Sequence, residues 1–109
     1  MKRKLTWSRQ ANFERIELVR HFQKQGIPVA RRFVRALRDA VGKAMAMPEF
    51  WGKLETDHPR MQNVRVLPIN PFKNHLLYYE ATDAELIIHH VAHGSRDVER
   101  LFGVTQDKP

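Results

Sequence analysis

The sequence predicts an α+β fold in which a helical hairpin packs on a small, mainly antiparallel sheet. Two long amphipathic patterns fill the first half of the chain, where apolar side chains recur every three or four residues. Runs of β-branched and aromatic residues fill the second half. A chain of 109 residues with a 42% hydrophobic fraction suffices for one domain, residues 1–109, with a single core. The expected order is β-α-α-β-β-β followed by a short C-terminal helix.

The first strand and the two helices follow from local signals. Residues 3–8 alternate polar and β-favouring side chains, which predicts a short strand. Ser8 is placed to cap a following helix, and Gly26 is placed to end it. Pro28 suits the first turn of a second helix, and Pro48 blocks its continuation. Because the link between the helices is short, we expect them to pack antiparallel as a hairpin.

The second half predicts a loop, three strands and a short helix. Residues 48–62 mix polar side chains with Pro and Gly, which predicts an irregular loop with Phe50 and Trp51 anchored on the core. The expected strands are 64–67, 75–81 and 86–91, with 68–72 as a rigid connection. Gly94 permits a sharp exit from the last strand, Ser95 or Asp97 can cap a helix over 96–102, and 103–109 is expected to be a loose tail.

Charge and composition restrict the possible partners. Nineteen Lys and Arg against twelve Asp and Glu give a net charge of +7 and a pI near 10.3, which favours nucleic acid or an acidic protein as partner. The absence of cysteine excludes disulfides, thiol catalysis and cysteine-ligated zinc. No apolar run approaches the roughly 20 residues of a membrane helix, and no signal-peptide core is evident, so we expect a cytoplasmic protein without membrane contact.

Three histidines near the end of the last strand form the densest group of possible metal ligands. In a regular strand, His89 and His93 share a face but lie about 13 Å apart, while His90 points to the other face. This geometry predicts no metal site, and we expect no cofactor. The histidines are interpreted as partly exposed hydrogen-bonding residues.

Several short motifs occur in an order that resembles a known family. They are Ala11-x-Phe13, Ala30-x-x-Phe33, the run Phe72-x-x-His75-Leu76-Leu77-Tyr78-Tyr79, and the ending His93-Gly94-x-Arg96-Asp97. Together they resemble the RelE/ParE superfamily, the toxins of bacterial type II toxin–antitoxin pairs. The resemblance implies the same fold and a cognate antitoxin with which the chain forms a hetero-oligomer.

The resemblance is closer to the ParE-like branch, which includes plasmid stabilisation proteins. Three features of the chain look like that branch: the His93-Gly94-x-Arg96-Asp97 ending, the Ala30-Arg31-Arg32-Phe33 start of the second helix, and the Met47-Pro48 pair that closes this helix. Such toxins inhibit growth by binding DNA gyrase and need no catalytic residues. The expected contacts with the target or with nucleic acid are Arg65, Lys73, His90, Arg96 and Arg100.

A RelE-like, ribosome-dependent mRNA endoribonuclease is the alternative. Such an enzyme works without a metal: a 2′-hydroxyl attacks its own phosphate, which requires a base, an acid and cations that stabilise the transition state. The candidate catalytic residues for this activity are Arg65, Lys73, His75, Tyr79, His90 and Arg96.

Two further expectations concern partners. The antitoxin is expected to contact large aromatic side chains beside the helical hairpin, and the candidates are Trp7, Phe50, Trp51 and Tyr78. A third hypothesis is a basic nucleic-acid-binding domain unrelated to toxins. The sequence carries neither a helix-turn-helix signature nor an aromatic-rich RNA-binding motif, which counts against it.

Overall fold

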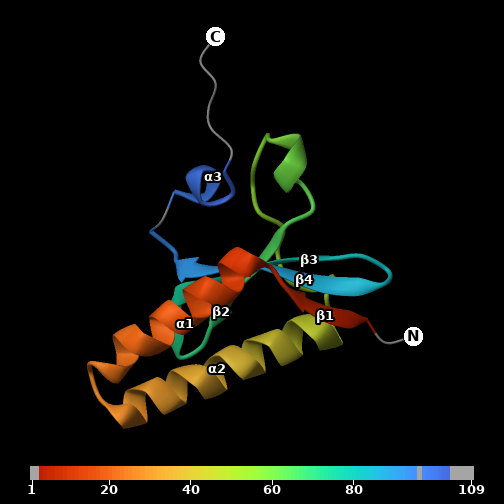
Figure 1. Cartoon of the computed structure of the whole chain (residues 1–109). Helices are drawn as coiled ribbons and strands as arrows, with labels where there is room; N and C mark the ends of the chain where they lie inside the picture. The colour runs from red at the N-terminus through yellow and green to blue at the C-terminus, as the bar shows by residue number, and fades with distance from the viewer. Residues whose placement is uncertain (1–2, 96, 104–109) are drawn as a thin grey trace.

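The computed structural model describes residues 3–95 and 97–103 of the chain. Its elements are strand β1 (Lys4–Trp7), helices α1 (Arg9–Gln23) and α2 (Ile27–Ala46), the 3-10 turn η1 (Pro59–Met61), strands β2 (Arg65–Ile69), β3 (Phe72–Ala81) and β4 (Glu85–His93), and helix α3 (Val98–Leu101). The strand order is β1-β4-β3-β2, with β1 parallel to β4 and the other pairs antiparallel (Figure 1). The predicted fold class and element order are confirmed.

The hairpin forms as its local signals predict. Ser8 caps α1, and its Oγ accepts the backbone N–H of Ala11 at 2.9 Å. Helix α1 ends at Gln23, three residues before the expected terminator, Gly26. Gly26 has φ 139° and instead turns the chain into α2, where Pro28 occupies the first turn.

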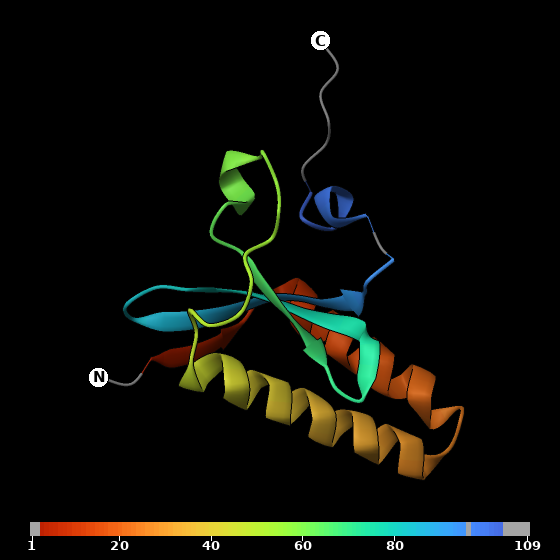
Figure 2. The same cartoon turned by 180° about the vertical axis from the view of Figure 1, so that it is seen from behind.

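The main core lies between the helical hairpin and one face of the sheet (Figures 1 and 2). Phe22 of α1 and Phe33 of α2 approach each other with ring centroids 4.8 Å apart, and Phe72 of β3 lies 5.0 Å and 5.3 Å from them. Each fully buried side chain of this size stabilises the fold by about 1.5–3 kcal/mol. The two helices are therefore held to the sheet by a common aromatic cluster.

A smaller cluster covers part of the opposite sheet face. Its fully buried members are Met61, Val64, Tyr78 and Ala92, and Leu101 and Phe102 of the C-terminal segment pack against them. The loop that carries η1 and the helix α3 rise side by side from this face (Figure 2). Both stand opposite the helical hairpin.

Several expected boundaries were wrong. Phe50 is 65% exposed and does not anchor the loop, whereas Trp51 packs against the main core. Strands β2 and β3 extend through most of the expected connection, which shrinks to Asn70-Pro71. These strands lengthen because Ile69 and Phe72 gain a place on the core. The part of the expected tail from 104 to 109 lies outside the described residues.

A β-bulge changes the expected arrangement of the histidines. Tyr78 lies opposite His90 and Tyr79 opposite Ile88, so that His89 is an extra residue in β4. The extra residue reverses the alternation of side chains, and His89 and His90 therefore line the same groove. The expectation that His89 and His93 share a face was wrong. Within the described ranges, no helix has the length and apolarity to cross a bilayer.

Candidate functional site

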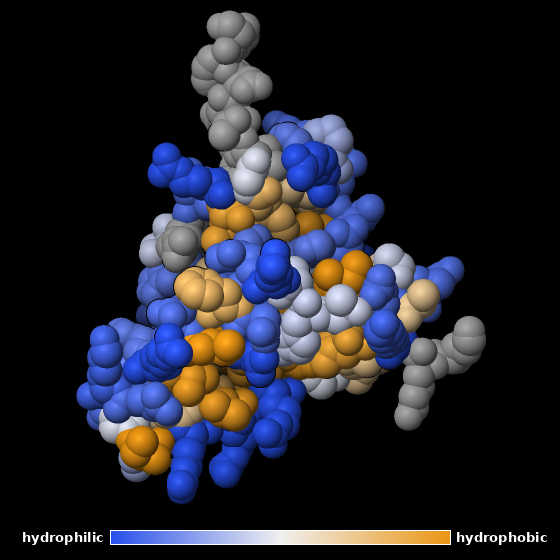
Figure 3. Space-filling model, in the orientation of Figure 1, coloured by the Kyte–Doolittle hydropathy of each residue, from blue (hydrophilic) through white to orange (hydrophobic). Residues whose placement is uncertain are grey.

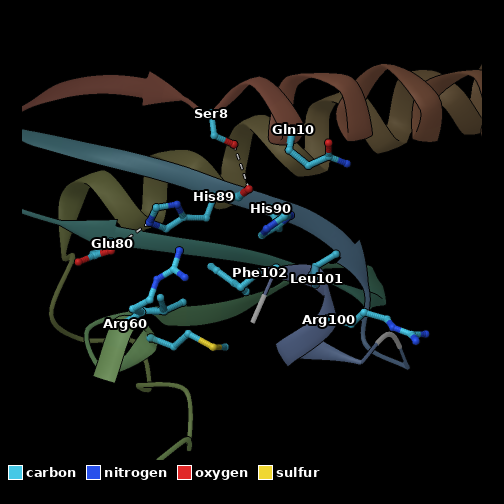
Figure 4. Close-up of a pocket in the computed structure, with 12 residues that line it drawn as sticks. Ser8, Gln10, Arg60, Glu80, His89, His90, Arg100, Leu101 and Phe102 are labelled. Carbon is cyan, nitrogen blue, oxygen red and sulfur yellow. Dashed lines mark hydrogen bonds and ion pairs between the residues drawn. The ribbon is translucent and has the colours of Figure 1, made fainter. Parts of the chain in front are cut away.

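A groove of about 490 Å³ opens on the sheet face opposite the helical hairpin. We call it the open-face groove. Its lining residues come from the start of α1, η1, β3, β4 and the C-terminal segment, and they are Ser8, Gln10, Arg60, Met61, Val64, Glu80, His89, His90, Arg100, Leu101, Phe102 and Gly103 (Figure 4). Polar, basic and aromatic side chains thus meet in one concave surface.

The bulged residue His89 forms a polar pair in this groove. Its Nε2 lies 3.0 Å from Oε1 of Glu80 on the neighbouring strand (Figure 4). Both side chains remain partly exposed, at 27% and 29%. The Ser8 Oγ donates to the backbone carbonyl of His89 at 3.0 Å, which fixes the bulge against the start of α1. A histidine oriented by a carboxylate and open to solvent has the arrangement of a proton-transfer group.

His90 is placed differently, because its side chain is only 8% exposed. Its Nδ1 lies 3.0 Å from Oε2 of Glu14 on α1, and its ring packs edge-on against Phe102 at 4.5 Å. Glu14 also accepts the backbone N–H of Val91 at 2.9 Å. Strand β1 pairs with β4 only as far as Ile88. Beyond that point the Glu14 side chain supplies the acceptor for the edge of β4. His90 is therefore part of the joint between α1 and the sheet.

Two arginines stand at the borders of the open-face groove. Arg60 extends from η1 toward His89, whereas Arg100 on α3 points outward (Figure 4). Both residues are exposed, and neither guanidinium has a hydrogen-bond or ion-pair partner within the part of the chain that the structure describes. Unpaired guanidinium groups beside a concave surface attract phosphate or carboxylate groups.

Two predicted site residues, Arg65 and Tyr79, lie on the helix side of the sheet instead. The Arg65 Nη1 donates to the backbone carbonyl of Trp51 at 2.7 Å, and the Tyr79 hydroxyl donates to that of Pro48 at 2.6 Å. Burial raises the pKa of Tyr79 to about 12, although the nearby Arg65 acts in the opposite direction. These two side chains fasten the loop that follows α2.

The remaining predicted residues lie elsewhere again. His75 contacts the rings of Phe22 and His93, at 5.5 Å and 5.2 Å. Burial, then the neighbouring His93 and His21, lower the pKa of His75. Lys73 is exposed near the start of β3, and Arg96 lies outside the described residues. Of the described candidates, only His90 and Arg100 reach the open-face groove.

Sequence reasoning missed three groove residues, Arg60, Glu80 and His89, and it also missed Glu14, whose carboxylate lies beside the groove residue His90. Arg60 lies in a segment read as irregular loop, which carries no periodicity from which its direction could be inferred. His89 was expected to share a face with His93 rather than with His90, because regular strand alternation does not account for the β-bulge. Glu14 did carry a signal, because a carboxylate close to an apolar stripe often has a buried partner.

A second concave surface runs along the outer side of the helical hairpin. We call it the hairpin groove. It begins at β1 and follows the seam of the helices, and its lining residues are Leu5, Trp7, Arg15, Val19, Gln23, Ile27, Ala30, Arg31, Val34, Arg35, Leu37, Arg38 and Val41. These include four arginines and neither Asp nor Glu. Figure 3 shows apolar surface over the hairpin bordered by hydrophilic side chains.

The expected antitoxin contacts are distributed unevenly around these surfaces. Trp7 lines the hairpin groove, where the Arg15 Cζ lies 4.9 Å from its ring centroid. Phe50 is exposed beside Met47 at the end of α2. Trp51 is half-buried, and Tyr78 is only 1% exposed in the small cluster. Trp7 and Phe50 are thus the accessible members of the set.

Comparison with known proteins identifies what the chain is similar to. The model of a family described as "ParE toxin of type II toxin-antitoxin system, parDE" matches residues 5–98. No curated protein sequence matches the chain. Among solved structures, a chain of the chromosomal ParDE toxin–antitoxin system from P. aeruginosa is 16% identical, with TM-score 0.68 over 84% of this chain and 96% of that one.

Two further solved structures share the fold. A chain of the E. coli DinJ-YafQ toxin–antitoxin complex is 14% identical, with TM-score 0.62 over 87% of this chain and 96% of that one. The YoeB dimer from Staphylococcus aureus is 18% identical, with TM-score 0.59 over 85% and 98%. At these identities the likeness shows the fold alone.

Proposed function

The chain belongs to the ParE toxin family of type II toxin–antitoxin systems, and from this premise we propose that it inhibits growth by binding DNA gyrase. The proposal extends to a cognate antitoxin that neutralises it in a hetero-oligomer. Both partners act in the cytoplasm, which is the expected location of the chain.

One observation supports protein contact over RNA cleavage: the candidate catalytic residues are dispersed. Arg65 and Tyr79 hold the loop after α2, and His75 packs in the aromatic cluster on the helix side. His90 is buried against Glu14. Transition-state stabilisation requires the base, the acid and the cation to converge within about 3 Å of the reacting atoms. A contact surface requires no such convergence.

The test is pulse labelling of DNA and protein synthesis in bacteria shortly after the chain is induced without antitoxin. Early loss of DNA synthesis with continued protein synthesis is the expected result. Loss of protein synthesis first would overturn the gyrase proposal. Unchanged labelling, with folded protein confirmed in the cells, would overturn the toxin activity as well.

A ribosome-dependent endoribonuclease is the second candidate, and the His89–Glu80 pair favours it. This pair is partly exposed in the open-face groove, and the exposed Arg60 lines the same groove. His89 is thus accessible for a proton transfer from a 2′-hydroxyl, and Arg60 is accessible to a phosphate. If the chain is a nuclease, His89→Asn and Arg60→Ala should each lower RNA cleavage by orders of magnitude.

Variants that remove a single arginine also distinguish gyrase binding from RNA cleavage. A gyrase contact surface should lose affinity gradually as single side chains are removed. Arg35→Ala, on the opposite side of the molecule, is a matched control because it removes the same charge outside the open-face groove. Equal effects of Arg60→Ala and Arg35→Ala on cleavage would rule out a nuclease site in the open-face groove.

The hairpin groove is the proposed seat of the antitoxin. Its apolar seam is bordered by Arg31, Arg35 and Arg38, which lie on one side of α2 at spacings of four and three residues. An amphipathic antitoxin segment with acidic borders would cover the apolar surface and lower the net charge of +7. The exposed Phe50 and the groove residue Trp7 are the proposed aromatic contacts.

A further inference from the structure

The side of α2 that faces away from the core carries four arginines, and all four are exposed: Arg31, Arg32, Arg35 and Arg38. We call them the basic stripe. At about 100° and 1.5 Å per residue, they occupy an arc of about 120° and about 10 Å of helix length. Helix α2 forms an outer edge of the molecule (Figures 1 and 2), and hydrophilic side chains project from that edge (Figure 3). The basic stripe is therefore open to a large partner.

The opposite side of α2 holds the basic stripe in place. Phe33 is 0% exposed, and Ala36, Leu37 and Ala40 are also buried in the main core. These buried residues alternate with the arginines along the same three turns of helix. Because a close-packed core resists rearrangement, the backbone beneath the arginines keeps its position when a partner binds.

The arginines of the basic stripe are unpaired, unlike arginines elsewhere in the molecule. Arg20 of α1 pairs with Glu17 at 3.2 Å, and the Arg65 Nη1 donates to a backbone carbonyl at 2.7 Å. Within the described ranges, no guanidinium of the basic stripe forms a hydrogen bond or an ion pair. Asp39 is the one acidic residue of α2, and it does not pair with Arg35 one turn away. The positive charge is available to an external anion.

Neighbouring arginines within the basic stripe repel one another. Arg31 and Arg35 are four residues apart, and Arg35 is three residues from both Arg32 and Arg38. Like charges at these spacings destabilise a helix. Phosphate groups bound between the guanidinium groups would remove this repulsion and form charge-assisted hydrogen bonds. A polyanion with closely spaced charges gains most from such a surface.

Duplex DNA has the required spacing of charges. It carries one phosphate charge per about 1.7 Å of its axis, so about six lie along the length of the basic stripe. Single-stranded nucleic acid is bound largely by stacking of bases on aromatic side chains. Phe33 is the only aromatic residue of α2 and is buried, so the basic stripe offers no stacking surface. These features favour the backbone of a duplex.

We propose that the basic stripe binds the phosphate backbone of duplex DNA. Helix α2 carries neither Asn nor Gln to read base edges, so the contact is independent of sequence. The inference goes beyond the proposed function, which gives the chain a protein target. DNA contact concentrates the free chain where gyrase works, but it is separate from the contact with gyrase. Arg31, Arg35 and Arg38 also border the hairpin groove, so DNA and a protein in that groove would exclude each other.

The experiment measures fluorescence anisotropy of a labelled 24-base-pair duplex mixed with the full chain, which is made by cell-free synthesis. We expect about micromolar affinity at 50 mM NaCl. Four phosphate contacts should give a slope of about −3.6 in a plot of log K against log salt concentration. The affinity should thus fall about a hundredfold between 50 and 200 mM NaCl. Single-stranded oligo-dT of the same length and a duplex RNA are the comparison probes, and both should bind more weakly.

Protein variants locate the contact. Arg31→Gln with Arg35→Gln should halve the slope to about −1.8, whereas Arg31→Lys with Arg35→Lys keeps the charge and should keep the slope. Arg60→Gln with Arg100→Gln is the matched control, because it removes two charges from the open-face groove. It should leave the slope within about 0.5 of the unmodified chain. Asp39→Asn removes the one negative charge on α2 and should strengthen binding severalfold.

Three results would overturn the proposal. The two glutamine pairs could lower the slope equally, which would assign binding to net charge alone. Oligo-dT or duplex RNA could bind as tightly as duplex DNA, or Asp39→Asn could leave the affinity unchanged. The assay contains no gyrase and no living cells. A chain that binds DNA but leaves DNA synthesis intact would refute only the proposed activity, and a chain that stops DNA synthesis without binding DNA would refute only the basic stripe.

Discussion

The Glu14 carboxylate of α1 accepts the backbone N–H of Val91, 2.9 Å away in the part of β4 that β1 does not reach. The same carboxylate lies 3.0 Å from Nδ1 of His90. A helix side chain thus completes the edge of a strand, and the side chain is only 12% exposed. This joint has consequences for stability.

Replacing Glu14 should destabilise the fold strongly. Glu14→Ala leaves the Val91 N–H and the His90 ring without their acceptor in a buried place, which costs about 2–3 kcal/mol in the free energy of unfolding. Urea unfolding followed by circular dichroism measures the change. Glu17→Ala is the control, since its partner Arg20 is exposed and the pair contributes less than about 1 kcal/mol. Equal losses for the two variants would contradict the assigned role of Glu14.

The stability of the protein should fall in mildly acidic solution because of His75. Burial, with positive charge on His93 and His21 as further causes, holds the pKa of His75 below its usual value of 6.5. The unfolded chain therefore binds a proton at His75 before the folded chain does. The contribution of neutral His75 is fully present above pH 6.5 and declines as the pH falls toward the folded-state pKa. His75→Gln should reduce the pH dependence of the urea unfolding midpoint between pH 7.5 and 5.5. An unchanged slope would assign the pH dependence to other groups.

The Tyr79 hydroxyl should hold the loop after α2 without taking part in proton transfer near neutral pH. Tyr79→Phe removes the donor to the Pro48 carbonyl and should cost about 1 kcal/mol in the free energy of unfolding. Tyr78→Phe is the matched control, because no hydrogen bond of the Tyr78 hydroxyl occurs within the described ranges. Absorbance titration should show one tyrosine that ionises only near pH 12, and this ionisation should be absent from Tyr79→Phe. A Tyr79 that ionises below pH 10 would refute this environment.

Charge reversal in the hairpin groove should release the toxin from its antitoxin. Arg31→Glu with Arg35→Glu places two carboxylates on the border that is proposed to meet acidic side chains. We expect the affinity for the cognate antitoxin to fall at least tenfold, measured by isothermal titration, while growth arrest by the free chain persists. Arg60→Glu with Arg100→Glu is the control on the opposite sheet face. If the control pair alone weakens the complex, the antitoxin occupies the open-face groove.

The fold was predictable because its signals are local and agree with one another. Ser8, Pro28 and Pro48 mark the helix ends by side-chain and backbone chemistry that tertiary contacts do not override. Alternating apolar and polar side chains and β-branched residues predicted where the strands lie, but they did not predict the full length of each strand. Strand length depends on which end residues gain core contacts, and that is decided by partners distant in sequence.

The groove was less predictable, and the reasons are physical. A single inserted residue at His89 reverses the side-chain alternation, and periodicity cannot locate such an insertion. Arg60 is presented by a short 3-10 turn whose direction depends on Met61 being buried. Arg65, His75 and Tyr79 had the right chemistry for a nuclease, but their alternation places them on the face that the helices cover. Residue type was therefore a poor guide to location.

The parallel pairing of β1 with β4 also governs the order in which the protein can assemble on the ribosome. Lys4 lies opposite Glu85, so the first strand has no partner until most of the chain has been synthesised. Both helices emerge well before β3 and β4, and their apolar faces stay uncovered during that interval. An antitoxin already present in the cell would meet the hairpin before the sheet exists. If the antitoxin binds the hairpin groove as proposed, neutralisation can begin during translation, before a complete toxin has been released.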